Sequence, residues 1–491
     1  MKQGVLFLCF LFFVCKLFAS EPPKQEVRAV WLTTAYGLDW PKKAAKTEAD
    51  TKAQQQALCD ILDRLQAAHI NMVFIQARIR GDVIYRSVIE PYSNILTGEY
   101  GKAPSYDPLQ FIIKECHKRG MECHAWLVTF PVGTPAVIRN QGNRSVVKRH
   151  PELCKLHEKQ WYLDPGLPET RKYLLTLVKE VVSVYDIDGI HFDYIRYPEK
   201  AETFPDKAVY QKYGKGKTLG EWRRDNITTL VESIYDTVKA LKPWVQVSTA
   251  PIGKYSRIPE MPNAGWTAYD VVYQDPKAWI EKDKHDMIVP MMYFLDNDFY
   301  PFVTNWVENC HQRLIVPGLG VYKMDKKEAG WPVKNIIDQI DFLRKQQVDG
   351  IAFYRCDYLL DNKYGLYEAL KEKYFKYPAL LPPLDWVCDT IPQAPEDVLV
   401  TREDNQLTLS WDTCGTQKEV YYTVYYAEAD TVDTNYATAI LATHLRDNKL
   451  TVPVDTTAER GLSFTVRTSN RYHVESNPSR PTYYYLSPYV K

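Results

Sequence analysis

The stretch Asp188-Gly189-Ile190-His191-Phe192-Asp193-Tyr194 decides the fold of this chain. Asp188-Gly189 predicts a turn, and the residues after it predict a short apolar strand that ends on a carboxylate. His191 and Asp193 are two positions apart, so a strand directs both side chains to the same face. A buried ionised aspartate is costly unless it is paired or used chemically. The polar end of this strand therefore predicts the mouth of a catalytic site.

This strand is the fourth of eight short β-rich runs that alternate with amphipathic stretches between Val27 and Lys376. We expect the strands at 28–34, 72–78, 122–130, 189–194, 245–250, 287–293, 314–319 and 350–354. We expect the helices near 54–68, 108–119, 168–185, 221–241, 270–281, 299–312, 333–347 and 364–375. Eight alternations predict an α/β fold, a (β/α)8 barrel of the TIM type with loop insertions. An open doubly wound sheet is the alternative, although no glycine-rich phosphate loop follows the first strand.

At 491 residues the chain is too long for one ordinary domain. We predict a barrel over 26–378, a proline-rich linker over 379–391 and a small all-β sandwich over 392–491, where alternating strands have no helix between them. Leu409-Ser410-Trp411-Asp412 and the 465–476 segment resemble the tryptophan strand and the last hairpin of a fibronectin type III module, which is immunoglobulin-like. The resemblance implies a spacer, or a platform for association with the cell envelope or a glycan.

Residues 1–20 have the pattern of a secretory signal peptide, with an apolar run over 5–14 and small residues at Ala19-Ser20. The run is too short for a stable membrane anchor, and we expect no integral membrane span elsewhere. The residues before Cys15 lack the small side chain of a lipoprotein cleavage site, so we do not expect lipid attachment. The sequence therefore predicts export to the periplasm or the extracellular space.

The charges of the chain balance, with 61 Lys and Arg against 61 Asp and Glu, so no net field would attract nucleic acid. A neutral or locally polar substrate is more natural. The 35 Tyr and 12 Trp residues supply flat amphipathic rings that suit stacking on sugars as well as filling a core. The cysteines show no metal-binding spacing, so we expect no metal and no cofactor. A disulfide between Cys116 and Cys123 stays open.

The carboxyl ends of the predicted strands carry many ionisable and aromatic side chains. In a barrel these ends meet at one rim, where such enzymes place their active sites. The fourth strand contributes His191, Asp193 and Tyr194. The other strand ends and the loops after them contribute Arg78, Asp82, Glu90, His124, Trp126, Tyr293, Arg355 and Asp357.

The barrel region resembles the glycoside-hydrolase-like family 10 proteins, formerly grouped as a domain of unknown function. The resemblance lies in these motifs: Arg28-Ala29-Val30-Trp31-Leu32-Thr33, Leu38-Asp39-Trp40-Pro41, Gln76-Ala77-Arg78, Gly81-Asp82, Tyr85, Glu90-Pro91-Tyr92-Ser93, Leu96-Thr97-Gly98, Tyr106-Asp107-Pro108-Leu109, His117-Lys118-Arg119-Gly120, His124-Ala125-Trp126, Leu163-Asp164-Pro165-Gly166, Asp188 to Tyr194, and Trp222-Arg223-Arg224-Asp225-Asn226. It implies a barrel with sugar-cleaving chemistry and a link to bacterial cell-wall glycan strands.

Glycoside cleavage needs two carboxyl groups on opposite sides of the scissile bond, one that donates a proton and one that is anionic. We predict Asp193 as the nucleophile or base and Glu90 as the acid, with Asp82 and Asp357 as alternative acids. By analogy with other sugar-cleaving barrels, an acid would be expected at the end of the fifth strand, but Ser248-Thr249-Ala250-Pro251 offers none. The structural alternative for Asp193 is an ion pair with Arg78 or Arg196 that only stiffens the mouth.

The predicted substrate is a polysaccharide, either a bacterial cell-wall glycan or a dietary glycan. We expect it to contact Arg78, His124, Trp126, His191, Tyr194, Tyr293 and Arg355. Two other functions stay open. A carbohydrate-binding barrel that has lost turnover would explain the missing strand-five acid. A metal-dependent polysaccharide deacetylase would use a facial triad of His124, His191 and Asp193.

Overall fold

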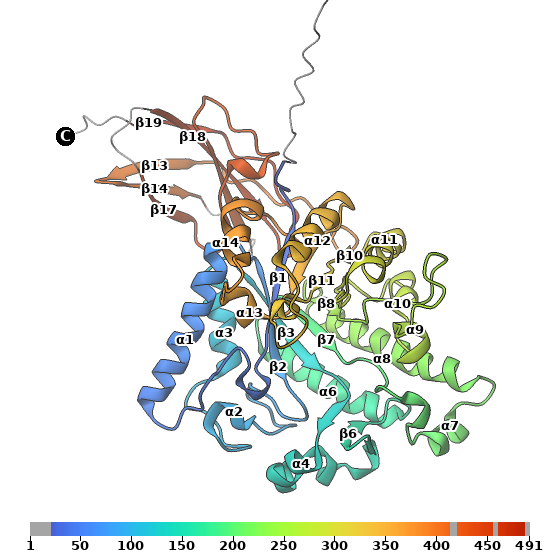
Figure 1. Cartoon of the computed structure of the whole chain (residues 1–491). Helices are drawn as coiled ribbons and strands as arrows, with labels where there is room; N and C mark the ends of the chain where they lie inside the picture. Colours follow the sequence, from blue (N-terminus) through green and yellow to red (C-terminus); the bar gives the residue numbers. More distant parts are fainter. Residues whose placement is uncertain (1–20, 413–419, 455–459, 487–491) are drawn as a thin grey trace, which may run out of the picture.

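The computed structural model describes residues 21–412, 420–454 and 460–486 (Figure 1). The leader at 1–20 and Cys15 therefore lie outside the described residues. A parallel sheet of nine strand segments forms a TIM-like barrel in the order β10-β9-β8-β7-β3-β2-β1-β12-β11. The segments are β1 Val27–Leu32, β2 Met72–Arg78, β3 Glu122–Val128, β7 Gly189–Asp193, β8 Gln246–Thr249, β9 Met287–Ile288, β10 Leu314–Ile315, β11 Gly318–Leu319 and β12 Gly350–Phe353.

The predicted strand at 314–319 is present as two segments, because β10 and β11 are separated only by Val316-Pro317. β10 pairs with β9, and β11 pairs with β12. The Gly318 N–H also donates to the Pro290 carbonyl at 2.9 Å, and the Met292 N–H donates to the Gly318 carbonyl at 3.0 Å. β10 and β11, which stand at opposite ends of the strand order, are therefore neighbouring segments of the chain, and the sheet curls back on itself.

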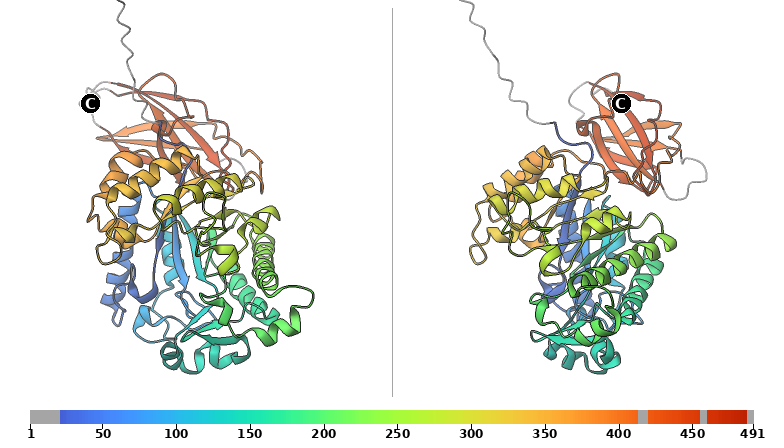
Figure 2. Two further views of the ribbon diagram at one scale, coloured as in Figure 1. Left: turned by 45° about the vertical axis from the view of Figure 1, so that its right-hand side comes forward. Right: turned by 90° about the vertical axis from the view of Figure 1, so that its right-hand side faces the viewer.

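Helices cover the outside of the sheet between successive strands (Figures 1 and 2). The two longest helices begin with capping boxes: Thr47 and Asp50 form one before α1, and Thr218 and Glu221 form another before α8. The predicted helix at 270–281 is present as two short helices because Pro276 restarts it. The helices are α1 Glu48–Ala67, α2 Asn94–Thr97, α3 Pro108–His117, α4 Pro135–Gln141, α5 Val146–Arg149, α6 Pro168–Val184, α7 Lys207–Tyr213, α8 Leu219–Leu241, α9 Ala268–Val271, α10 Pro276–Glu281, α11 Tyr300–Glu308, α12 Val333–Lys345, α13 Cys356–Leu360, and α14 Leu366–Ala369 followed by a π-helical turn at Leu370–Tyr374.

The chain adds a small insertion between β3 and α6. It contains α4, α5 and a three-stranded antiparallel sheet of β4 Pro131–Gly133, β5 Cys154–His157 and β6 Gln160–Leu163. Figures 1 and 2 show this insertion at the end of the barrel opposite the C-terminal sheets. It borders the carboxyl ends of the strands, where the sequence places the site.

The C-terminal region consists of two antiparallel sheets. One has the order β13-β14-β17 and the other β16-β15-β18-β19. Leu409, Trp411, Val424, Phe464 and Val466 are buried between them. The fibronectin type III identity of this region stays a prediction. The strands are β13 Val398–Glu403, β14 Gln406–Trp411, β15 Tyr421–Ala427, β16 Ile440–Leu445, β17 Lys449–Pro453, β18 Arg460–Ser469 and β19 Thr482–Leu486.

The proline-punctuated segment at 379–391 packs against the barrel rather than crossing solvent. The Leu380 N–H donates to the Lys24 carbonyl at 2.8 Å, and the Leu380 carbonyl accepts from the Glu26 N–H at 2.9 Å. Leu384 is fully buried in the same apolar cluster as Val27 and Met72, at the N-terminal ends of β1 and β2. This segment therefore closes the barrel end that lies away from the predicted site.

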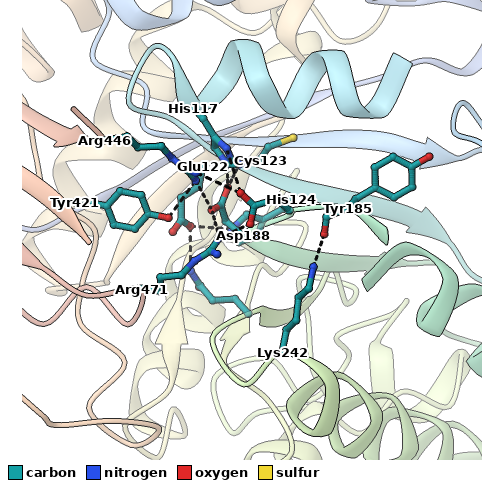
Figure 3. A network of polar contacts seen from close by, with 12 residues as sticks. His117, Glu122, Cys123, His124, Tyr185, Asp188, Lys242, Tyr421, Arg446 and Arg471 are labelled. Carbon is teal, nitrogen blue, oxygen red and sulfur yellow. Dashed lines mark hydrogen bonds and ion pairs between the residues drawn. The ribbon is translucent and has the colours of Figure 1, made fainter. Parts of the chain in front are cut away.

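A buried polar network joins the C-terminal sheets to the same end of the barrel (Figure 3). The His473 imidazole contacts the Glu122 carboxylate at the start of β3 at 2.6 Å. Arg471 forms an ion pair with Asp186 at 2.7 Å, and His117 contacts Asp188 at 2.7 Å. These charged side chains fix the C-terminal region to the end of the barrel where the strands begin. The partners come from the C-terminal sheets on one side and from the barrel on the other.

Two further sequence questions can be answered from the described residues. Cys116 and Cys123 are both buried and carry free thiols, so they do not form a disulfide. Over 21–412, 420–454 and 460–486, no helix combines the length and the apolar character needed to cross a membrane.

Candidate active site

A pocket of about 570 Å³ opens at the carboxyl ends of the barrel strands. We call it the rim pocket. Asp193 ends β7, Trp126 belongs to β3, and Tyr354 follows β12, so side chains from several strands converge there. The predicted residues that line it are Trp126, Asp193, Tyr194, Tyr293 and Arg355. Arg196, named in the sequence analysis only as a possible ion-pair partner of Asp193, also lines it. The lining residues that the sequence analysis did not single out include Glu199, Trp266, Tyr322, Glu328 and Tyr354.

Asp193 is the most deeply placed carboxylate of the rim pocket, with 7% of its surface exposed. Its Oδ1 accepts the Tyr194 backbone N–H at 2.7 Å. Burial raises the pKa of Asp193 to about 6, although the nearby Arg196 guanidinium, this N–H and the Trp126 indole favour its ionised form. At neutral pH a measurable fraction of this carboxyl group is therefore protonated, and Asp193 can both donate and accept a proton.

Aromatic rings form one wall of the rim pocket. Tyr293 and Tyr354 are stacked with ring centroids 5.5 Å apart, and Tyr322 meets both rings edge-on. Trp31 lies behind Tyr354 with a centroid distance of 6.0 Å. Such flat apolar faces next to a carboxylate suit a sugar ring, which has both apolar C–H faces and hydroxyl edges.

Arg355 is fixed at the edge of the rim pocket by an aspartate that the sequence analysis did not select. Its guanidinium donates to Asp39 and, at 2.9 Å, to the Leu38 carbonyl. Asp39 is buried and also accepts the backbone N–H groups of Thr33 at 2.7 Å and Asp357 at 2.9 Å. Burial raises the pKa of Asp39, and Arg355 opposes the rise. Asp39 belongs to the Leu38-Asp39-Trp40-Pro41 motif, but the spacing of the motif does not show that its partner is Arg355.

A second hollow of about 310 Å³ continues from the rim pocket toward the insertion. Tyr194, Arg196 and Glu199 line both hollows, so they form the boundary between them. Arg80, His157, Tyr162 and Lys200 also line the second hollow. A polymeric ligand that occupied both hollows would lie against Arg196.

Glu90, the predicted acid, does not line the rim pocket. Its carboxylate is buried and accepts two hydrogen bonds from Arg78, at 2.7 and 2.8 Å, and one from the Tyr173 hydroxyl at 2.9 Å. Arg78 also donates to the Thr129 carbonyl at 2.9 Å, which ties the end of β2 to the end of β3. The geometry therefore makes Glu90 and Arg78 a buried structural pair, and it does not support either as a group that touches substrate.

The alternative acids do not line the rim pocket either. Asp82 is buried in the turn after β2, where its carboxylate accepts the Arg80 N–H at 3.2 Å and burial raises its pKa to about 6. Asp357 is half exposed and forms ion pairs with Lys42 at 3.1 Å and Arg355 at 3.7 Å. Neither of these carboxylates shares the rim pocket with Asp193.

Two carboxylates that the sequence analysis passed over do line the rim pocket. Glu199 lies in the loop after β7, and Glu328 lies in the loop between β11 and α12. Both side chains are exposed. They are the candidates for the second carboxyl group of a glycosidase.

The predicted histidines lie deeper in the barrel, one side-chain layer below the rim pocket. His191 Nδ1 contacts the Ser248 hydroxyl at 2.8 Å, its Nε2 accepts the Trp31 indole N–H at 3.1 Å, and burial lowers its pKa well below the usual value. His124 Nε2 contacts Glu122 at 2.9 Å. Their nitrogens are thus turned away from Asp193, and the facial triad does not form. Among the described residues no group of three His, Cys, Asp or Glu side chains is arranged to hold a metal ion.

Comparison with known proteins places the chain in a family. Residues 26–311 match the family described as glycosyl hydrolase-like 10. The protein named glycosyl hydrolase YngK from Bacillus subtilis is 31% identical over 490 residues, covering 94% of each chain. The protein named glycosyl hydrolase DigH from Escherichia coli is 33% identical over 383 residues, covering 69% of this chain and 86% of that one.

A solved structure adds a more distant likeness. The glycoside hydrolase domain of PgaB (BpsB) from Bordetella bronchiseptica covers 70% of this chain and 98% of its own length, at 14% identity and a TM-score of 0.49. The family match and the two relatives carry the assignment. The chain belongs to the glycosyl hydrolase-like 10 family.

Proposed function

We propose that the protein is an exported glycoside hydrolase that cleaves O-glycosidic bonds of a polysaccharide at the rim pocket. The observation that carries the proposal is Asp193, a buried carboxyl group with a pKa of about 6 beside a wall of aromatic rings. Family membership supports a sugar-cleaving reaction, and both relatives are named glycosyl hydrolases. The substrate is a bacterial cell-wall glycan or a dietary glycan.

In the proposed mechanism Asp193 is the proton donor. Hydrolysis of a glycoside requires an acid to protonate the leaving oxygen and a second carboxylate to attack or to activate water. A carboxyl group whose pKa lies near the working pH is matched to the first task. Glu199 or Glu328, both exposed at the pocket edge, then supplies the anion. The sequence predicts Asp193 as the anion and Glu90 as the acid. In the proposed mechanism Asp193 is instead the acid, and Glu90 takes no part.

Export and attachment complete the proposal. The pattern of residues 1–20 supports secretion to the periplasm or the extracellular space. The two C-terminal sheets, which we propose to be a fibronectin type III module, would present the barrel to the envelope or to a polymer. Because the module packs on the N-terminal strand ends, it leaves the rim pocket open to a long substrate.

The test is hydrolysis of a glycan panel by the full chain, measured as the release of reducing ends. We expect the Asp193→Asn variant to lose at least about 1000-fold in kcat because it cannot donate a proton, while it still binds the glycan. We expect Glu199→Gln or Glu328→Gln to show a loss of similar size, and the one that does identifies the second carboxyl group. Unchanged hydrolysis by Asp193→Asn would overturn the mechanism.

A carbohydrate-binding protein without turnover is the second candidate. The specific observation in its favour is that the other carboxylates lining the rim pocket, Glu199 and Glu328, are exposed on loops rather than held in a buried site. This candidate predicts that the parent protein binds a glycan and releases no reducing ends over hours. Release of new reducing ends that depends on Asp193 would exclude it.

A further inference from the structure

Arg196 is a buried arginine that forms no ion pair with any carboxylate among the described residues. Its side chain is 4% exposed and lines both the rim pocket and the second hollow. Its Nε is buried without a hydrogen-bond partner, and among the described residues no hydrogen bond or ion pair involves its guanidinium. Other buried arginines of the barrel are satisfied: Arg78 pairs with Glu90, and Arg223 pairs with Asp206.

Two aromatic rings hold the Arg196 guanidinium in place. It lies 4.7 Å from the centroid of the Tyr194 ring and 5.3 Å from that of Trp266. Cation–π contacts of this kind offset part of the cost of removing a charge from water. They leave the planar N–H donors of the guanidinium unused, although these donors fit a carboxylate in a bidentate geometry. The arginine is therefore oriented, desolvated and unpaired, which is the state of a residue that awaits an anion.

The neighbouring charges do not take that role. Asp193 lies close enough for Arg196 to lower its pKa, yet the two groups form no ion pair within 4 Å. Glu199 lines the same hollows and is exposed, and it also forms no ion pair with Arg196 in the described residues. Arg80 and Lys200 also line the second hollow, and Lys200 is paired there with the Glu158 carboxylate at 3.2 Å. Among the described residues, the Arg196 guanidinium at this boundary therefore has no carboxylate within ion-pair distance, although carboxylates line both hollows.

We infer that Arg196 binds a carboxylate on the sugar unit next to the one held at Asp193, so that the substrate is an acidic glycan. The inference rests on the proposed function for the register of the sugar, but the anion site follows from Arg196 itself. A polymer that runs from the rim pocket into the second hollow places one sugar over the aromatic wall and the next over Arg196. The exposed fractions of Tyr194 and Trp266, 39% and 37%, leave ring surface for that second sugar.

The inference is tested by binding in the Asp193→Asn background, where turnover cannot interfere. The probes are oligogalacturonate and hyaluronan oligosaccharides, each compared with its methyl-esterified form, with affinities measured by calorimetry. We expect each acidic form that fits to bind about 10-fold more tightly than its ester, since a charge-assisted bidentate contact is worth that much. We expect Arg196→Gln to remove the preference and Arg196→Lys, which keeps the charge without the planar fork, to restore part of it.

Arg224 supplies the matched control. Its guanidinium also stacks on a tyrosine ring, 4.1 Å from the Tyr269 centroid, but it lines neither hollow. Arg224→Gln should keep the preference for the acidic form. A thermal unfolding curve for each variant separates loss of the anion site from loss of the fold. Equal affinity for acid and ester in every pair, or no binding of either acidic glycan, would overturn the inference.

A pH profile gives a readout that a merely structural arginine would not move. Because Arg196 lowers the pKa of Asp193, Arg196→Gln should shift the basic limb of hydrolysis to higher pH. An unshifted limb in a variant that still turns over would count against contact between the two groups. Cleavage of acidic and neutral glycans at equal rates would refute the acidic substrate and keep the hydrolase. Acid-selective binding without cleavage would refute the hydrolase and keep the anion site.

Discussion

Replacing Asp193 by asparagine should make the protein more stable while it removes activity. Burial raises the pKa of Asp193 from 3.8 to about 6, which means that the folded state holds its ionised form at a cost. Asparagine has nearly the same shape but no charge. Its side-chain oxygen can still accept the Tyr194 N–H, so the contact at 2.7 Å is kept.

The size and the sign of the effect follow from proton linkage. The difference between 3.8 and about 6 corresponds to about 3 kcal/mol, at 1.36 kcal/mol per pH unit. Because the folded pKa is raised, the stability associated with the protonated carboxyl group is complete below pH 3.8 and is lost as pH rises through about 6. Asp193→Asn should therefore gain up to about 3 kcal/mol at pH 8 and nothing from this cause at pH 4.

Urea unfolding followed by tryptophan fluorescence at pH 4, 6 and 8 measures this difference. The control is Asp236→Asn, an exposed carboxylate paired with Lys284 on the surface, which should change stability by no more than about 0.5 kcal/mol at any of the three values. A gain that is equal at pH 4 and pH 8 would refute the linkage argument. A loss of stability at pH 8 would show that the Asp193 charge is paired rather than strained.

Three other predictions concern two buried ion pairs and the protonation of Asp193. His473→Ala should reduce the free energy of unfolding by about 3 kcal/mol in urea unfolding, because it leaves the buried Glu122 charge with fewer partners; a loss below about 1 kcal/mol would show that this contact does not fix the C-terminal sheets. Glu90→Gln should cost about 3 kcal/mol through the unpaired Arg78, yet leave kcat within about threefold, and a collapse of kcat in folded protein would restore Glu90 as the acid. Hydrolysis should decline as pH rises through about 6, where Asp193 loses its proton, and a rate that rises there would make Asp193 the base.

The alternation of strands and helices was the part of the fold that the sequence could predict well. The strand at 72–78 matches β2 at both ends, and the helix expected at 168–185 matches α6 to within one residue. β2 begins with a continuous apolar run, and α6 has a clear helical periodicity and a proline in its first turn. The insertion with β4, β5 and β6 was missed, because its strands have only three or four residues and their antiparallel pairing is decided by contacts with the barrel.

The sequence predicts only part of the candidate site. The alternation of side chains along a strand shows which face a residue is on, but not how deep in the barrel it lies. His191 and Asp193 do share the inner face of β7, as do His124 and Trp126 on β3. Two residues along a strand are about 7 Å, which is one layer of a barrel interior. The second residue of each pair therefore reaches the rim pocket and the first stays in the core.

Arg78 departed from the prediction for a different reason. The pairing of β2 with β3 shifts between Gln76 and Arg78, so that Arg78 lies opposite Leu127 rather than one residue further along. An irregularity of this kind turns the side chain that follows it. It directs Arg78 to Glu90 and to the Thr129 carbonyl instead of the rim pocket. A pattern of residue types cannot show such a shift.

The two aspartates of the opening motif show why position on a strand is not enough to assign chemistry. Asp188 precedes β7 and Asp193 is its last residue, and both are buried. Burial alone would raise the pKa of either group, but the His117 partner outweighs it at Asp188 and holds the pKa below its usual value. Asp193 has no such partner, and its pKa is raised. Because a satisfied carboxylate stays ionised, whereas one with few partners can exchange a proton near neutral pH, we interpret Asp188 as part of the scaffold and propose Asp193 for the proton transfer.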